Sequence, residues 1–201
     1  MREENRKSER VIVGCMTGTS LDGLDLARVR VLGNGLQMSW RCEGTFSLPF
    51  GDLGQRLRRI ASGQPVPAAE FTSAAAQLAE LHADALRDFL DGRQADLICV
   101  HGQTVFHVPP LSLQLLQPAS IAHRLKTPVV FDLRAADLAA GGQGAPITPI
   151  ADFVLFRSQH RRAIVNLGGF ANFTLLPATT GAENAEQLLN QIDGGDICAC
   201  N

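Results

Sequence analysis

The segment from Gly14 to Asp25, GCMTGTSLDGLD, gathers residue types that can contact phosphate, Mg²⁺ or sugar hydroxyls. Gly18 lets the backbone approach a ligand closely, and the hydroxyls of Thr19 and Ser20 can donate to phosphate oxygens. Its two aspartates are acceptors suited to a hydrated Mg²⁺ or to a sugar. The segment lacks the GK[ST] of a Walker A loop. The alternative is a hairpin turn capped by these same small polar residues.

A second polar group follows a short apolar strand expected at 96–100. It is the segment HGQTVFHVPP, which contains His101, Gln103, Thr104 and His107. Ligands of α/β proteins commonly bind where buried strands end, and this favours a binding role. Metal chelation is not expected, because no helical i, i+4 histidine pair is present. The alternative is that the histidines are ordinary core or surface residues.

The third segment, Asp132 to Pro146, reads DLRAADLAAGGQGAP. An apolar strand leads into Asp132 and Arg134, and Asp137 follows before a glycine-rich GGQG. A carboxylate at a strand end beside such a loop suits a general base. The alternative is an ordinary loop in which Asp137 caps a helix.

The fourth segment, Asn166 to Thr174, reads NLGGFANFT. Two adjacent glycines between two strands predict a hairpin whose backbone N–H groups could cradle a phosphate. A single glycine pair is weak support for that function, and a purely structural hairpin is the alternative.

These segments are positioned by an alternation of short strands and helices, which indicates an α/β or mixed fold with its chemistry at strand ends. Strands are expected at 11–13, 24–31, 36–42, 96–100, 129–131, 164–167 and 173–176. Helices are expected at 51–61, 68–90, 121–125 and 151–156. Residues 1–10 form a polar leader.

The composition excludes several classes of protein. The chain has 201 residues, 45% hydrophobic and 19% charged, with a formal net charge of −2. It is therefore expected to fold, with no general attraction to nucleic acid or to an anionic membrane. No apolar stretch is long enough for a membrane span, and no signal peptide is recognised, so we expect a cytoplasmic protein. The five cysteines are odd in number and scattered, which is typical of reduced thiols.

Taken in order, the four segments resemble the anhydro-N-acetylmuramic acid kinase family. The family reads approximately GxMSGTSxDGxD, then HGQTVxHxP, DxRxxDxAxGGQGAP and NxGGxANxT. This chain follows all four between Val11 and Pro177, with Thr17 in place of the usual serine, a change that keeps the hydroxyl. The resemblance implies a two-lobed fold of the actin, Hsp70 and hexokinase group, which is ribonuclease H-like. It implies an enzyme that uses ATP and Mg²⁺ to open the 1,6-anhydro ring of 1,6-anhydro-N-acetylmuramic acid and to phosphorylate O6 during peptidoglycan recycling.

The resemblance also assigns roles to residues. Asp137 would match the catalytic aspartate, and His101, Gln103, Thr104 and Arg134 would lie at or near the sugar. The nucleotide would be held by two turns, made of Gly18, Thr19, Ser20, Leu21, Asp22, Gly23, Leu24 and Asp25, and of Gly168 and Gly169. The partners implied are the amino sugar and ATP, and a homodimer is left open.

The chain departs from the family pattern near its end. GGDICACN stands where the family reads GFDTGPGN, so Asp196 aligns but Cys198 and Cys200 replace glycines. The chain is also shorter than family members, so we expect 11–201 to form the N-terminal lobe with most of the second lobe missing. Two alternatives follow: a non-catalytic lobe that binds sugar or a partner, and a kinase for another amino sugar.

Overall fold

A computed structural model describes residues 9–167, 170–179, 187 and 189–199. Its main feature is a five-stranded sheet in the order β3-β2-β1-β4-β7. β1 (Glu9–Thr17), β2 (Gly23–Leu32) and β3 (Ser39–Pro49) pair antiparallel, with a short 3₁₀ turn, η1 (Gly35–Gln37), between the last two. β4 (Leu97–Val100) and β7 (Val129–Phe131) extend the sheet in parallel to β1.

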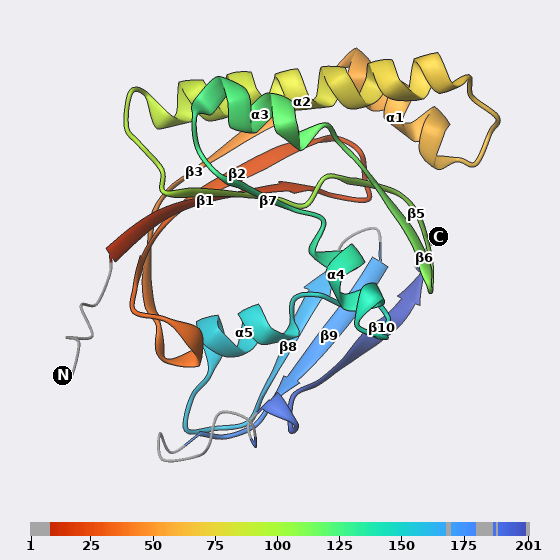
Figure 1. Cartoon of the computed structure of the whole chain (residues 1–201). Helices are drawn as coiled ribbons and strands as arrows, with labels where there is room; N and C mark the ends of the chain where they lie inside the picture. The colour runs from red at the N-terminus through yellow and green to blue at the C-terminus, as the bar shows by residue number, and fades with distance from the viewer. Residues whose placement is uncertain (1–8, 168–169, 180–186, 188, 200–201) are drawn as a thin grey trace.

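Three helices cover one face of this sheet: α1 (Asp52–Ala61), α2 (Ala68–Leu90) and α3 (Pro118–Leu125) (Figure 1). Alternate residues of β1 and β2 point toward these helices. The alanine and leucine side chains on one face of α2 pack against the sheet. Parallel and antiparallel pairing in one sheet with flanking helices confirms the mixed α/β class. The largest fully buried members of this core are Leu24, Leu26, Leu57, Leu78, Leu86, Ile98, Leu115 and Ile121.

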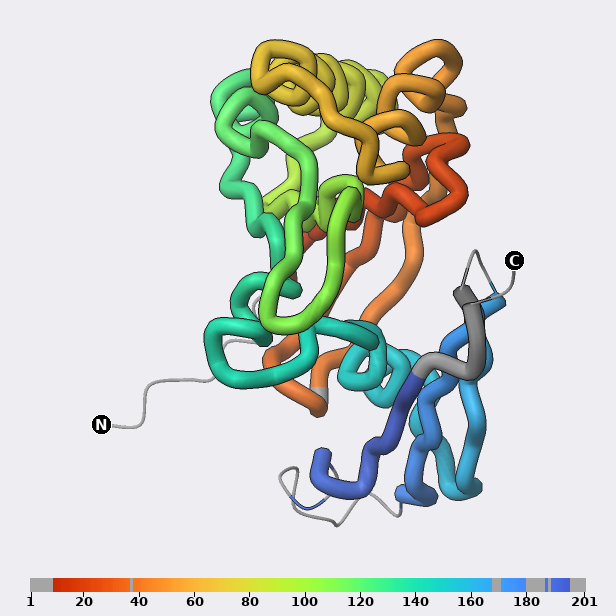
Figure 2. Tube along the Cα trace, turned by 90° about the vertical axis from the view of Figure 1, so that its right-hand side faces the viewer, coloured from red at the N-terminus to blue at the C-terminus, as the bar shows by residue number. Residues whose placement is uncertain are grey.

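A separate hairpin extends from the end of β4. It consists of β5 (Gln103–Val108) and β6 (Leu111–Leu115), which pair only with each other. Figure 2 shows it in light green, descending from the helical layer toward the segment that contains α4 (Leu133–Ala139). The hairpin therefore links the first sheet with the helix that follows β7.

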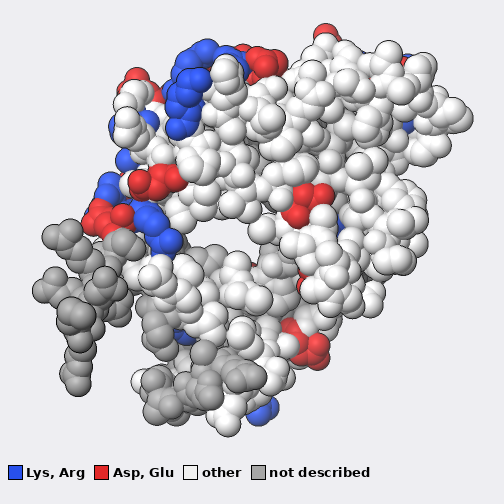
Figure 3. Space-filling model, viewed as in Figure 1, with Lys and Arg blue, Asp and Glu red and all other residues white. Residues whose placement is uncertain are grey.

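The rest of the chain forms a second sheet, in the order β10-β9-β8, with α5 (Pro149–Phe156) against it. Its strands are β8 (Arg162–Leu167), β9 (Phe170–Leu176) and β10 (Asp193–Ala199), all antiparallel. Phe153 and Leu176 form a small buried cluster against which Leu36 of η1 packs. The space-filling view shows an opening between the two parts, with atoms in contact on both sides of it (Figure 3).

Most predicted elements are confirmed, with shifted ends. The helix predicted at 68–90 coincides with α2, whereas the strand predicted at 36–42 starts at Ser39 and continues to Pro49. The strand predicted to begin at Val11 begins at Glu9, inside the expected polar leader. The division into a leader and a single lobe stays a prediction.

Candidate active site at the strand ends of the first sheet

Three of the four polar segments begin where neighbouring parallel strands end. β1 leads into Gly18, β4 into His101 and β7 into Asp132, and these strands lie side by side in the sheet. The hydroxyl of Thr17 donates to Gly102 O at 2.9 Å, and Gln103 Nε2 donates to Gly18 O at 3.3 Å. The first and second segments are therefore bonded to each other, at the edge where α/β sheets commonly bind ligands.

Gly102 is required where these segments meet. Its φ is +78°, a left-handed conformation that L residues with a Cβ rarely adopt. An added Cβ would also lie 2.8 Å from Phe131 Cε2. The glycine thus lets the chain turn from β4 into β5 directly against β7, which places His101 and Gln103 on either side of the turn.

Gln103 presents a buried acceptor. Its side chain is 1% exposed, and Nε2 donates to Gly18 O and Thr104 O, each at 3.3 Å. Two carbonyl partners fix the amide so that Oε1 points the other way, and Oε1 has no hydrogen-bond partner among the described residues. A buried acceptor without a donor costs free energy, so this oxygen suits a ligand hydroxyl or N–H.

Arg134 joins the second segment to the third. One guanidinium nitrogen donates to Gly144 O at 2.6 Å, and the other lies 3.2 Å from His101 Nε2. Because arginine has donors only, Nε2 must accept and the ring proton sits on Nδ1. Burial, together with the positive charge of Arg134, lowers the pKa of His101 to about 4. His101 is therefore neutral at pH 7 and acts here as an acceptor.

Asp137 anchors the GGQG loop. Its Oδ2 accepts the backbone N–H of Gly144 at 2.6 Å, and its backbone carbonyl accepts the N–H of Gly142 at 2.9 Å. The carboxylate is nevertheless exposed. Asp137 lies inside α4 and is not a helix cap: that position belongs to Asp132, whose Oδ1 accepts the N–H of Ala135 at 3.0 Å.

The turn between β1 and β2 contributes fewer side chains than predicted. Leu21 and Leu24 are buried in the core, so a ligand could meet only their backbone. Gly23 packs against Leu48 O of β3, and Asp25 accepts the Ser47 hydroxyl at 2.5 Å. The exposed residues are Thr19, Ser20, Asp22 and Asp25, with Gly18 half-buried beside them; Ser20 donates to Asp22 at 2.8 Å.

The fourth segment lies on the second sheet. Asn166 of β8 faces Asn172 of β9, and Thr174 donates to Asp152 of α5 at 2.6 Å. Gly168 and Gly169, the predicted second phosphate turn, lie outside the described residues. β10 approaches the third segment, because a Cβ on Gly194 would be 3.2 Å from Pro149 and 3.6 Å from Pro146.

Two residues of this network were not predicted. Val13, Cys15 and Thr17 are alternate residues of β1 that face the core. The alternation therefore makes a buried hydroxyl at the end of this strand predictable. Gln114 is 5% exposed and accepts the Thr104 hydroxyl at 2.6 Å. Nothing in LSLQLL distinguishes this glutamine before the hairpin register is known.

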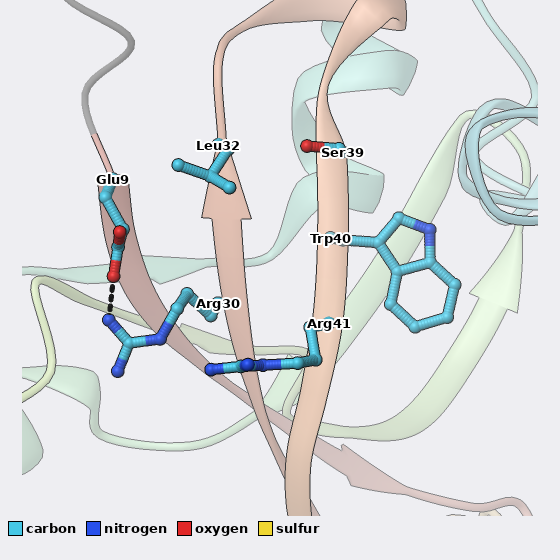
Figure 4. Close-up of a pocket in the computed structure, with 6 residues that line it drawn as sticks. All are labelled: Glu9, Arg30, Leu32, Ser39, Trp40 and Arg41. Atoms are coloured by element: carbon cyan, nitrogen blue, oxygen red, sulfur yellow. Dashed lines mark hydrogen bonds and ion pairs between the residues drawn. The ribbon is translucent and has the colours of Figure 1, made fainter.

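A pocket of about 310 Å³ lies elsewhere, on the three antiparallel strands β1, β2 and β3 of the first sheet. Figure 4 shows its lining by Glu9, Arg30, Leu32, Ser39, Trp40 and Arg41. Arg30 pairs there with Glu9 and also with Glu43, whose pKa is lowered to about 2 by its hydrogen bonds to Arg30 and Arg41. These charged side chains are paired with one another, and no described site residue lines the pocket.

Neither a metal centre nor a membrane span is found in the part of the chain that the structure describes. No three His, Cys, Asp or Glu side chains there gather as metal ligands, and none of its helices is long and apolar enough to cross a bilayer.

A mixed sheet with polar loops at its parallel strand ends is the architecture of a sugar-kinase type lobe. Comparison with known proteins agrees, since the family model described as anhydro-N-acetylmuramic acid kinase matches residues 10–184. The chain belongs to this family.

Several curated relatives carry the name anhydro-N-acetylmuramic acid kinase. The protein from Prochlorococcus marinus is 38% identical over 186 residues, covering 89% of this chain and 49% of the relative. The relative from Gloeobacter violaceus is 41% identical, with 85% and 48% covered, and that from Salinibacter ruber is 40% identical, with 87% and 48% covered. The chain thus spans about half the length of the curated relatives it matches.

Proposed function

We propose that this chain supplies the sugar-binding half of an ATP-dependent kinase that opens 1,6-anhydro-N-acetylmuramic acid. Within a protein of its relatives' length, the reaction would hydrolyse the 1,6-anhydro ring and phosphorylate O6. The products are N-acetylmuramic acid 6-phosphate and ADP, formed in the cytoplasm during peptidoglycan recycling. The observation that carries the proposal is the cluster of Gln103, Thr104, His101 and Arg134, in which each residue has a polar atom within 3.4 Å of the next, at the strand ends of a family member.

The cluster suits the hydroxyl and acetamido groups of an amino sugar. Gln103 Oε1 is a buried acceptor, and His101 is neutral. Sugar hydroxyls and an acetamido N–H are donors that such acceptors recognise. The sugar is therefore proposed to lie along the second segment, with Arg134 holding His101 and the GGQG loop in place.

The ring opening needs a base that takes a proton from water as the water attacks C1. We assign this role to Asp137, whose exposed carboxylate is already held by the Gly144 N–H. The competing candidate is Asp196, which aligns with the aspartate of the family's GFDTGPGN pattern. Asp132 is the third candidate, although it caps α4.

The steps balance without a further reactant. The water oxygen bonds to C1, the C1–O6 bond breaks, and O6 becomes the nucleophile toward the γ-phosphorus of ATP, releasing ADP. Backbone amides and hydroxyls around Gly18, Thr19 and Ser20 would stabilise charge on the transferring phosphate. Asp22 and Asp25 are the exposed carboxylates of that segment, and Asp25 accepts from Ser47. A bound Mg²⁺ would neutralise phosphate charge there.

The reaction is tested in a protein that carries this chain together with the second half found in its relatives. Incubation with 1,6-anhydro-N-acetylmuramic acid and ATP in ¹⁸O-water should give the 6-phosphate with one label, on the anomeric oxygen. Unlabelled product would overturn the hydrolytic step, and absence of product would overturn the activity. N-acetylglucosamine in place of the anhydro sugar tests the alternative of another amino-sugar kinase.

A second candidate, a lobe that binds sugar without catalysis, is favoured by one observation. Cys198 and Cys200 stand where the family pattern has glycines, and a Cβ limits both positive φ and close approach of a ligand. Titration of the chain with the anhydro sugar, with and without ATP, separates the two functions. Sugar binding that persists in the longer protein while ATP turnover is absent would support the second candidate.

A further inference from the structure

Gln114 of β6 links the hairpin to the candidate sugar site. Its Oε1 accepts the Thr104 hydroxyl at 2.6 Å, and its Nε2 donates to the Ser112 hydroxyl at 3.1 Å. Ser112 in turn donates to Phe106 O at 3.4 Å, and His107 Nδ1 lies 3.1 Å from the same hydroxyl oxygen. With its hydrogen on that carbonyl, Ser112 Oγ accepts from Gln114 Nε2 and can also accept from His107 Nδ1. Gln114 Oε1 is therefore the end of the amide that faces Thr104.

The orientation of the amide determines the direction of the Thr104 hydroxyl. A hydroxyl has one hydrogen, and that of Thr104 is committed to Gln114. Its oxygen lies 3.4 Å from His101 Nε2, a long separation that fits two acceptors. Arg134 supplies the donor that His101 Nε2 requires, at 3.2 Å.

We propose, on the basis of the proposed function, that Gln114 is a positioning residue. It keeps Thr104 Oγ1 available as a hydrogen-bond acceptor, so that a hydroxyl or N–H of the ligand can donate to this oxygen. Without Gln114, the Thr104 hydroxyl would turn to His101 Nε2 and compete with Arg134. The site would then lose one acceptor toward the sugar and part of the contact that orients Arg134. Chains of hydrogen bonds polarise one another, so each link depends on the next.

The first test does not require the sugar. Gln114→Met keeps the volume of the side chain and removes the strong acceptor, while Leu113→Met changes the exposed neighbour on the other face of β6. The ¹⁵N chemical shift of His101 Nε2 in the unliganded chain, assigned with His101→Gln, should change in Gln114→Met, because a second donor then reaches a nitrogen that already accepts from Arg134, and should stay unchanged in Leu113→Met. Equal shifts in the two methionine variants would overturn the proposal.

The second test is a double-mutant cycle on the affinity for 1,6-anhydro-N-acetylmuramic acid, measured by calorimetry. Gln114→Met should raise Kd roughly three- to tenfold, the effect of one neutral hydrogen bond. In a Thr104→Val background the same change should have no further effect, because the hydroxyl that it orients is gone. An equal loss in both backgrounds would overturn the proposal. Absence of sugar binding in the unmodified protein would instead refute the proposed function, while the ¹⁵N measurement still decides the role of Gln114.

Discussion

The carboxylate of Asp137 and the backbone N–H of Gly144 are hydrogen-bonded at 2.6 Å, across the GGQG loop. The residue proposed as base is therefore also a structural anchor, and its two roles need different substitutions. Asparagine keeps an oxygen that can accept from Gly144, but it cannot take a proton. Alanine removes both functions.

Asp137→Asn, in the protein of full family length, is expected to lower kcat by at least about 10²-fold, the low end for loss of a general base. The affinity for the sugar should change little, because the loop contact remains. Steady-state kinetics and calorimetry measure the two effects. If Asp137→Asn keeps near-normal kcat while Asp196→Asn or Asp132→Asn abolishes turnover with the fold intact, the base is the residue whose change abolishes it.

Asp132 should behave as a helix cap. It adopts a φ of 53°, and its Oδ1 accepts the N–H of Ala135. Asparagine tolerates this conformation and can cap, whereas alanine does neither well. We expect Asp132→Ala to lower the free energy of unfolding by about 1–2 kcal/mol and Asp132→Asn to lower it by much less. Urea denaturation of both variants checks this; equal losses would show that the negative charge, and not the cap, stabilises α4.

The sequence predicted the large elements well because their signals are local. α2 is long and has a regular apolar stripe, and the buried strands β4 and β7 are short apolar runs bounded by polar residues. The β5–β6 hairpin was missed for a physical reason. Phe106, Val108, Leu111 and Leu113 are exposed, while Thr104 and Gln114 are half-buried or buried, the reverse of the usual pattern.

The candidate site was predictable in its residues but not in its contacts. His101 and Arg134 are 33 positions apart, and their contact follows from the parallel pairing of β4 with β7, which sequence patterning does not specify. α4 was missed because its seven residues contain too little apolar periodicity to show a helix. Its cap at Asp132 has a left-handed backbone, which no local pattern revealed.

The stability effect of the close approach between Gly102 and Phe131 can be measured separately from the effect of the left-handed backbone at Gly102. Gly92 has nearly the same φ, +74° against +78°, but an added Cβ there meets nothing within 4 Å. Gly92→Ala should cost about 1–2 kcal/mol of stability from the left-handed backbone alone. Gly102→Ala should cost at least about 1 kcal/mol more, because its Cβ would collide with Phe131. Equal losses in denaturation experiments would show that Phe131 moves aside freely.

His82 is expected to make the fold sensitive to acid. It is fully buried in α2, Nδ1 lies 2.7 Å from Leu78 O, and Nε2 has no partner among the described residues. Burial lowers the pKa of His82 from 6.5 to about 4. The unfolded chain therefore binds a proton on His82 near pH 6.5, whereas the folded chain binds it only near pH 4. Because the unfolded state binds the proton more readily, the contribution of His82 to the free energy of unfolding is fully present above pH 6.5 and is lost as the pH falls toward 4. The loss from this residue is at most about 3 kcal/mol.

His82→Leu isolates that contribution, because leucine fits an apolar environment and cannot titrate. At pH 7 the variant should be about as stable as the parent or more so, since an unpartnered buried nitrogen is removed. Between pH 6.5 and 4 its free energy of unfolding should fall less steeply; some slope remains, because the pKa of His101 is also lowered to about 4. His160→Leu, at an exposed position, is the matched control and should keep the parent slope. Urea denaturation at several pH values gives the free energy of unfolding of all three proteins. If this free energy has the same pH dependence in His82→Leu as in the parent, His82 accepts a proton in the folded state as readily as in the unfolded state.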